Sequence, residues 1–175
     1  MLNYSYINVI IIYIKKFKGV DTLDPSVAIQ IVALVVLIAL SSFFSSAETS
    51  FVSVNLIRMR SLADDGNKRA ARVLKIRENS AKMLSAVLIG NNLVNISASA
   101  LATMVAQSLF GNSAVGIATG IMTVVVLIFG EITPKTIATA NADKIAPIYS
   151  SIIWLLMIVF TPVIFILNKV SSAFL

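Results

Sequence analysis

The chain contains several apolar stretches that are long enough to cross a lipid bilayer, and this feature constrains its fold more than any other. The three clearest run from about Val27 to Phe44, from Met83 to about Leu109 and from Ala114 to Glu131. A stretch of about 20 apolar residues crosses the hydrocarbon core as a helix, because lipid satisfies no backbone hydrogen bonds. With 58% hydrophobic residues and a mean hydropathy of +0.92, the sequence predicts an all-α integral membrane protein with three transmembrane helices.

The chain has no cysteine and no histidine, which excludes disulfides and removes the usual ligands of zinc, copper and haem. Any bound metal ion must therefore be held by oxygen atoms. The same absences remove Cys–His and Ser–His nucleophile pairs, and there is no G-x-S-x-G motif, so we expect no enzyme. The net charge of +6 does not indicate nucleic-acid binding, because the basic residues lie mostly in one loop between apolar stretches.

Residues 1–25 are expected to form an interfacial segment on the outer side. Their apolar run, Ile7 to Ile14, is too short to span a bilayer, and the lysines that follow it lead to no small-residue cleavage site. Asp24 and Pro25 then form a strong helix start, with Asp24 as the N-cap and Pro25 at the first helical position. The membrane domain is therefore predicted to occupy residues 26–172.

Eight of the fourteen lysines and arginines lie between residues 53 and 82. An excess of basic residues marks a cytoplasmic loop, so we expect a multi-pass protein of the cell membrane with this loop inside and the N-terminus outside. A turn signal at residues 64–67 divides the loop into two short amphipathic helices. These juxtamembrane helices are expected to lie on the membrane surface, in contact with lipids.

Residues 135–172 begin with a polar stretch and continue into a second long apolar run, Ile145 to Leu167. Its length alone is compatible with a fourth span. However, Pro162 divides the run into a longer and a shorter piece, so a re-entrant hairpin or helices lying in the interface are equally consistent. We therefore expect a C-terminal pair of re-entrant or interfacial helices.

An acidic residue, Glu131, ends the third apolar stretch. An ionisable group in or at the edge of a span costs about 2.5–3.5 kcal/mol even on lenient scales, which makes it a candidate functional group. Pro134 strengthens this interpretation, because it has no N–H to donate to the carbonyl of Gly130 four residues earlier. A helix through this stretch would offer a carboxylate and a freed carbonyl oxygen together, which suits a cation.

The second apolar stretch carries a polar stripe. Asn91, Asn95 and Ser99 recur every four residues and so share one face of a helix, and Asn92 adjoins Asn91 in the sequence. Lipid can satisfy none of their hydrogen bonds, so the stripe must face protein or water. One asparagine would be explained by hydrogen bonding between helices. Three within five residues favour the lining of a cavity.

The first span ends in a polar face made by Ser41, Ser45 and Glu48, at spacings of four and three. These residues either mark the exit from the membrane or line an ion site, and Glu48 is equally open to both interpretations. Antiparallel packing would set Asn91 and Glu131 at similar depth, and Glu131 is the sole acid in the second and third spans. The predicted metal ligands are Ser45, Asn91, Asn95, the Gly130 carbonyl and Glu131, with Glu48 and Asn92 as further candidates.

Three blocks of the sequence together resemble the membrane domain of the CorC/CNNM magnesium-transporter family. The blocks are FFSSAET at residues 43–49, IGNNLVN at 89–95 and FGEITPK at 129–135. The resemblance implies a homodimer of three-span protomers that moves magnesium, outward and coupled to sodium. It also implies an ion site at Ser45, Asn91, Asn95 and Glu131.

Members of that family usually continue into a cytoplasmic pair of CBS domains that binds ATP, and such domains are expected in a full-length protein. They are absent from this chain, which implies either a fragment or a protein without nucleotide regulation. Mg²⁺ and Na⁺ accept the same oxygen donors, so the residues alone do not choose between them. The alternative function is a non-transporting dimeric membrane anchor or ion sensor, in which the polar stripe only holds helices together.

Overall fold

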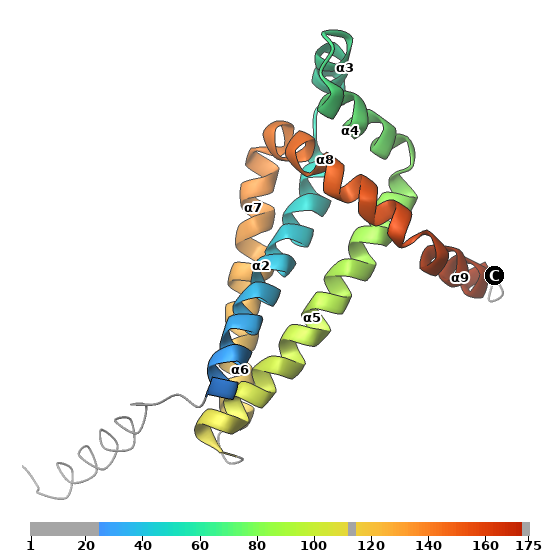
Figure 1. The fold of residues 1–175 in the computed structure, drawn as a ribbon. Helices are drawn as coiled ribbons and strands as arrows, with labels where there is room; N and C mark the ends of the chain where they lie inside the picture. Colours follow the sequence, from blue (N-terminus) through green and yellow to red (C-terminus); the bar gives the residue numbers. More distant parts are fainter. Residues whose placement is uncertain (1–24, 112–114, 173–175) are drawn as a thin grey trace, which may run out of the picture.

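The computed structural model describes residues 25–111 and 115–172, and these residues fold almost entirely into helices (Figure 1). The elements are α2 (Pro25–Ser53), α3 (Leu56–Asp64), α4 (Lys68–Glu78), α5 (Ser80–Phe110), α6 (Val115–Val126), the π-helix η2 (Leu127–Ile132), α7 (Thr133–Ala140), α8 (Ala142–Val159) and α9 (Thr161–Ser172). The described part of α2 begins at Pro25. The expected interfacial segment and the Asp24 cap lie outside the described residues.

Three long helices run side by side and form the body of the domain. They are α2, α5 and the continuous helix made by α6, η2 and α7, and α5 runs antiparallel to the other two (Figure 1). All three are long and apolar enough to cross a membrane. The predicted all-α membrane fold is thus confirmed, although α5 begins at Ser80 rather than Met83, and the third helix continues past Glu131 to Ala140.

The C-terminal apolar run forms two helices, and the break between them falls at Phe160, where Pro162 predicts it. Proline is tolerated in the first turn of a helix, and Pro162 is the second residue of α9. Among the described helices α8 is a fourth candidate span by length and composition. It does not join the three long helices in parallel but crosses them obliquely at one end, and α9 points away from them (Figure 1).

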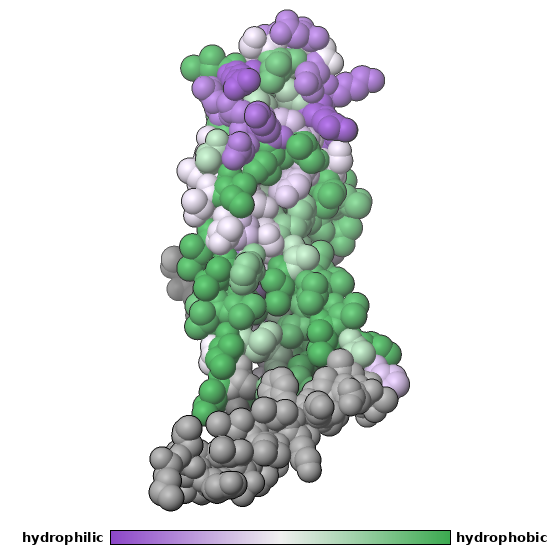
Figure 2. Space-filling view, turned by 90° about the vertical axis from the view of Figure 1, so that its left-hand side faces the viewer, coloured by the Kyte–Doolittle hydropathy of each residue, from purple (hydrophilic) through white to green (hydrophobic). Residues whose placement is uncertain are grey.

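The basic stretch forms two short helices, α3 and α4, as predicted. Asn55 and Asn67 begin them, and each asparagine side chain accepts hydrogen bonds from two backbone N–H groups of the helix that follows. Gly66 makes the turn between them at φ +90°, where a residue with a Cβ would be strained. Figure 2 shows the result as a hydrophilic cap above a wide apolar band.

One apolar core holds this cap and α8 to the long helices. Its fully buried members include Phe51 of α2, Met59 of α3, Val73 of α4, Met83 of α5 and Ile153 of α8. An ion pair adds to it, because Asp143 at the start of α8 accepts from Arg58 at 3.2 Å and from the backbone N–H of Asn55 at 2.9 Å. The core therefore holds α2 and α5 in place at the end of the three-helix group that lies next to the cap.

Candidate ion site between α2, α5 and η2

The π-helical turn η2 places Glu131 against α2 and α5. Its backbone bonds reach one residue further than those of an α-helix, and the N–H of Thr133 donates to the carbonyl of Ile128. Pro134 follows directly and has no N–H with which to continue an α-helical ladder. Single π turns within α-helices frequently lie at functional sites. The disruption expected before Pro134 therefore takes the form of a wider turn in an uninterrupted helix.

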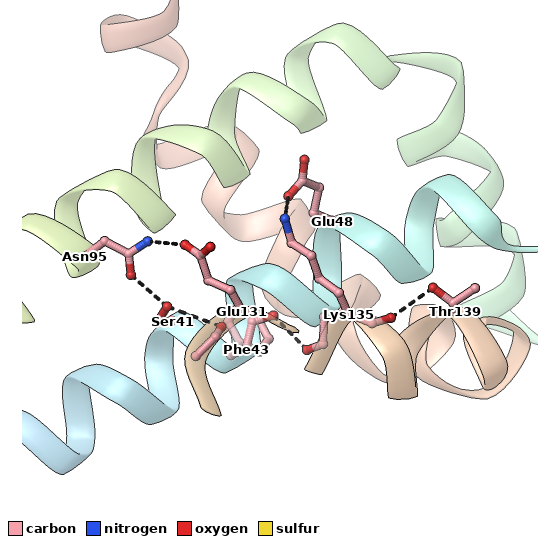
Figure 3. A network of polar contacts seen from close by, with 9 residues as sticks. Ser41, Phe43, Glu48, Asn95, Glu131, Lys135 and Thr139 are labelled. Carbon is pink, nitrogen blue, oxygen red and sulfur yellow. Dashed lines mark hydrogen bonds and ion pairs between the residues drawn. The ribbon is translucent and has the colours of Figure 1, made fainter. Parts of the chain in front are cut away.

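A chain of hydrogen bonds joins all three long helices at this level (Figure 3). The amide of Asn95 donates to the carboxylate of Glu131 at 2.9 Å, and the hydroxyl of Ser41 donates to the amide oxygen of Asn95 at 2.7 Å. The same hydroxyl lies 3.4 Å from the carbonyl oxygen of Gly130. A hydroxyl has one proton to donate, and Ser41 donates it to the nearer acceptor, the amide oxygen of Asn95. The Gly130 carbonyl thus keeps accepting capacity inside the protein.

The next level contains two buried oxygen atoms that accept or donate no hydrogen bond within the described part of the chain. They are Oγ of Ser45, a fully buried residue, and Oδ1 of Asn91. Ser45 follows Ser41 by one turn, and Asn91 precedes Asn95 by one turn in the antiparallel helix, so both lie about 6 Å further toward the polar cap. Buried polar atoms are nearly always paired. Two unpaired oxygens at one level indicate a site for a positively charged or hydrogen-bonding guest.

The third level is an ion pair between Lys135 and Glu48, with 3.6 Å between Nζ and Oε2. Both side chains are about half exposed. This third level of polar side chains therefore reaches the surface of the protein. Lys135 stands four residues after Glu131, a spacing at which a glutamate and a lysine pair readily on a helix. The structure instead pairs Lys135 with Glu48 and Glu131 with a neutral amide (Figure 3). Among the described residues, no cationic side chain therefore forms an ion pair with Glu131.

Two glycines allow the helices to approach closely at these levels. A Cβ added to Gly90 would lie 2.4 Å from the ring of Phe44, and one added to Gly130 would lie 2.9 Å from Oγ of Ser41. Real Cβ atoms do not come this close to another atom, so any larger residue would push α5 or η2 away from α2. The oxygens of the three helices converge because these two positions carry no side chain.

The arrangement offers only oxygen donors around one carboxylate. Within the described residues there is no group of three or more acidic, histidine or cysteine side chains, so a cation here would rely on neutral oxygens as well as on Glu131. Carboxylate, amide, hydroxyl and carbonyl oxygens are the ligands of hard cations such as Mg²⁺, Ca²⁺ and Na⁺. The chemistry of these oxygens therefore suits a hard cation rather than a soft one.

The residues predicted from sequence do not all meet. Asn95, Gly130 and Glu131 lie within one hydrogen-bonded chain, and Ser45 and Asn91 carry the unpaired oxygens beside it. Glu48 stands at the opening, paired with Lys135. The exposed Asn92 is not brought to the group. Ser41 also belongs to the hydrogen-bonded chain but is not among the predicted ligands, although its spacing of four from Ser45 places it on the same face.

Comparison with known proteins identifies relatives that share most of this sequence. The family described as the Cyclin M transmembrane N-terminal domain matches residues 32–175. The UPF0053 inner membrane protein YfjD of Escherichia coli is 44% identical over 132 residues, which are 75% of this chain and 31% of that protein. A UPF0053 protein of Haemophilus influenzae is 43% identical over 137 residues, 78% of this chain and 33% of that protein.

A third relative is named the polyamine export protein of Haemophilus influenzae; it is 30% identical over 157 residues, which are 82% of this chain and 36% of that protein. The chain thus spans about a third of the length of the curated relatives that it matches. The match over residues 32–175, together with these identities, confirms the resemblance seen in the three sequence blocks. This chain belongs to the CNNM family, and it contains that family's Cyclin M transmembrane domain.

Proposed function

We propose that this chain is the membrane part of a magnesium transporter rather than an enzyme, and that Mg²⁺ crosses through the site between α2, α5 and η2. The observation that carries the proposal is the pair of buried, unpaired oxygens of Ser45 and Asn91, each one helical turn from a residue of the hydrogen-bonded chain that contains Glu131. Buried oxygens without hydrogen-bond partners are energetically unfavourable, and a cation that enters between them would supply the missing interactions.

In the arrangement described here, the ligands are partly occupied by one another. The amide N–H of Asn95 donates to the carboxylate of Glu131, and its amide oxygen accepts a hydrogen bond from the hydroxyl of Ser41. A bound cation would compete for the Glu131 carboxylate and the Asn95 amide oxygen, so these hydrogen bonds would have to open as the ion arrives. Mg²⁺ keeps several waters when bound, and so the chain needs to supply only part of its six oxygens.

Outward movement of Mg²⁺ coupled to Na⁺ is part of the same proposal. Na⁺ accepts the donors that Mg²⁺ accepts but brings half the charge, so a site with one carboxylate can hold either ion in turn. Exchange of the two ions through one site would couple the Na⁺ gradient to Mg²⁺ export. A homodimer and cytoplasmic CBS-type domains in the full-length protein complete the proposed assembly.

The proposed topology has the α3–α4 cap in the cytoplasm and the N-terminus outside, on the strength of the basic residues in that cap. The chain has no natural cysteine, so single cysteines can report on it. Lys68→Cys should react with an impermeant maleimide only after cells are opened, whereas Asn112→Cys should react in intact cells. Labelling of position 68 in intact cells would show that the α3–α4 cap lies outside, opposite to the proposed topology.

Magnesium flux in liposomes that contain this chain alone tests the transport proposal. A Na⁺ gradient should drive Mg²⁺ movement, and Glu131→Gln should reduce the rate by at least about a hundredfold, because a buried ion site would lose its charge. Asp65→Asn makes the same chemical change on an exposed residue of the cap and should leave the rate unchanged. Absence of flux in the folded parent chain would favour an anchor or sensor, and flux of spermidine without Mg²⁺ would favour a polyamine substrate.

A further inference from the structure

A second cavity lies where the junction of α4 and α5 meets the start of α9, and it shares no lining residue with the ion site. Its volume is about 470 Å³, within the range of about 300–1,000 Å³ that is typical of small-molecule sites. Glu78 comes from the end of α4, Ser80, Lys82 and Ser85 come from the start of α5, and Thr161 and Ile164 come from α9. The cavity therefore combines charged, hydroxyl and apolar groups from three helices.

The cavity carries one positive and one negative side chain, and neither forms an ion pair with another described residue. The ion pairs within residues 25–111 and 115–172 are Arg58–Asp143 and Lys135–Glu48, so Lys82 and Glu78 have no charged partner there. A guest that satisfies both must carry a negative and a positive group. A simple anion or a simple cation would leave one of the two charges unmatched.

Two of the three hydroxyls of the cavity have a defined hydrogen-bonding polarity. Ser80 donates to the carbonyl of Arg77, and Thr161 donates to the carbonyl of Met157 at 2.7 Å. Because each hydroxyl proton is used, these oxygens can only accept from a guest. Together with the Glu78 carboxylate they favour a group rich in N–H donors, whereas Lys82 favours an acceptor such as phosphate.

The level of the cavity in the membrane follows from its neighbours. On α9 the apolar side chains of Val163, Phe165 and Ile166 are exposed, which favours contact with hydrocarbon in a membrane protein. On α4 the exposed side chains include the charged Lys75 and Glu78, which require water or headgroups. The cavity lies between these two surfaces and includes apolar Ile164 and Phe165 in its lining. This is the zone in which phospholipid headgroups lie.

We propose that the cavity binds the headgroup of a phospholipid that carries a phosphate and a primary ammonium, as phosphatidylethanolamine does. Lys82 binds the phosphate, and Glu78 accepts from the ammonium. Phosphatidylglycerol has no cation for Glu78, and phosphatidylcholine has a quaternary ammonium without an N–H to donate. The geometry thus selects by headgroup chemistry and not by charge alone.

Native mass spectrometry of the purified chain, titrated in detergent with the three lipids on identical acyl chains, tests this proposal. The parent should retain phosphatidylethanolamine about threefold to fivefold better than either other lipid, the size of a partly exposed charge contact. Glu78→Gln should remove that preference, and Lys82→Gln should weaken retention of all three lipids. Asp64→Asn and Lys75→Gln make matched charge changes on exposed residues outside the cavity and should change nothing.

The comparison of the three lipids on the parent chain tests the proposal even if a variant fails to fold. Equal retention of the three lipids by the parent would overturn the proposal. Tighter retention of phosphatidylglycerol would also overturn it, because it would show a general attraction of the basic cap for anionic lipid. Loss of the preference in dimers, with the preference kept in monomers, would assign the cavity to a contact between copies of the chain and overturn it as well.

Discussion

The two ends of the three-helix group use glycine in opposite ways. At the end near the polar cap, Gly90 and Gly130 are closely covered by Phe44 and Ser41 of α2. At the other end, Gly116 and Gly120 of α6 have no atom near the space that a Cβ would occupy. That end also has an apolar cavity of about 330 Å³, lined by α5 and α6 residues such as Val105 and Ile121. One end is tightly packed around polar atoms, and the other is open and apolar.

This difference shows that a small residue in a span does not by itself locate a helix contact. The spacing of Gly116 and Gly120 is typical of close helix pairs, yet the described chain places no helix against them. Gly90 and Gly130 are far apart in the sequence and do not form a small-xxx-small pair, yet they decide how near α5 and η2 come to α2. Polar oxygens converge only at the tightly packed end, and the proposed ion site depends on that packing.

Gly90→Ala should have the largest effect among changes that leave every oxygen in place. The added methyl group meets the ring of Phe44, which is itself buried and edge-on to Phe43, so the ring cannot easily move away. Overpacking outweighs the gain in helix propensity, and the expected net loss of stability is about 1–2 kcal/mol. Thermal unfolding of the purified variant measures it.

Gly116→Ala is the matched control, because it adds the same methyl group to open space. It should leave the melting temperature unchanged or slightly raised, since alanine favours the helix. Equal destabilisation by the two substitutions would contradict the inference that only the end near the cap is tightly packed.

Ser45→Ala should weaken Mg²⁺ binding while the protein without ion becomes no less stable. The substitution removes one proposed ligand, which corresponds to about 0.5–1.5 kcal/mol or threefold to tenfold in affinity. It also removes a buried hydroxyl that has no partner among the described residues, and this loss is not expected to destabilise the fold. Isothermal titration calorimetry with Mg²⁺ and a melting curve report the two quantities separately.

Ser50→Ala serves as the control for Ser45→Ala, since Ser50 is equally buried but bonds only to the carbonyl of Ala47 in its own helix. It should not change Mg²⁺ affinity. Unchanged affinity in Ser45→Ala as well would mean that its unpaired oxygen does not face the ion.

Glu48→Gln should weaken Mg²⁺ binding by about threefold to fivefold, although Glu48 is not among the proposed inner ligands. Without Glu48, Lys135 is free to approach Glu131 one turn away and to compete with the ion. The double variant Glu48→Gln, Lys135→Gln should restore the affinity of the parent in the same calorimetric titration. A double variant no better than Glu48→Gln would show that Glu48 acts on the ion directly.

Pro134→Ala should have the smallest effect, about twofold to threefold on Mg²⁺ affinity, in line with a weak adjustment of one carbonyl. The alanine supplies an N–H, which allows an α-helical register in place of the π turn η2 and draws the Gly130 carbonyl into the ladder. Calorimetry measures the affinity, and hydrogen exchange around residues 127–135 reports the change of register. If exchange changes and affinity does not, the Gly130 carbonyl is not a ligand.

Much of the fold could be predicted from the sequence, because the apolar stretches, the turn at residues 64–67 and Pro162 are local signals with a direct physical meaning. They fix the three long helices, the α3–α4 pair and the break before α9. The oblique course of α8 could not be predicted, since it depends on a core that joins residues such as Phe51 and Ile153 from distant parts of the chain.

The candidate site was only partly predictable. Glu131 and Asn95 stood out because polar groups in a span are unfavourable unless they have partners. Ser41 lies on the predicted polar face but is not among the predicted ligands, because no local spacing shows that its hydroxyl reaches Asn95 on another helix. The pairing of Lys135 with Glu48 instead of Glu131 depends on the relative rotation of α2 and α7, which no local spacing reports.

The central claim is that a hard cation binds where the oxygens of three helices converge at the tightly packed end. Anomalous diffraction from crystals of this chain grown with Mn²⁺, which takes the same oxygen ligands as Mg²⁺, tests it most directly. The account predicts one strong peak within coordination distance of the Glu131 carboxylate, flanked by oxygens of Ser45 and Asn91. A peak beside Glu48 or in the cap, with none at Glu131, would contradict it.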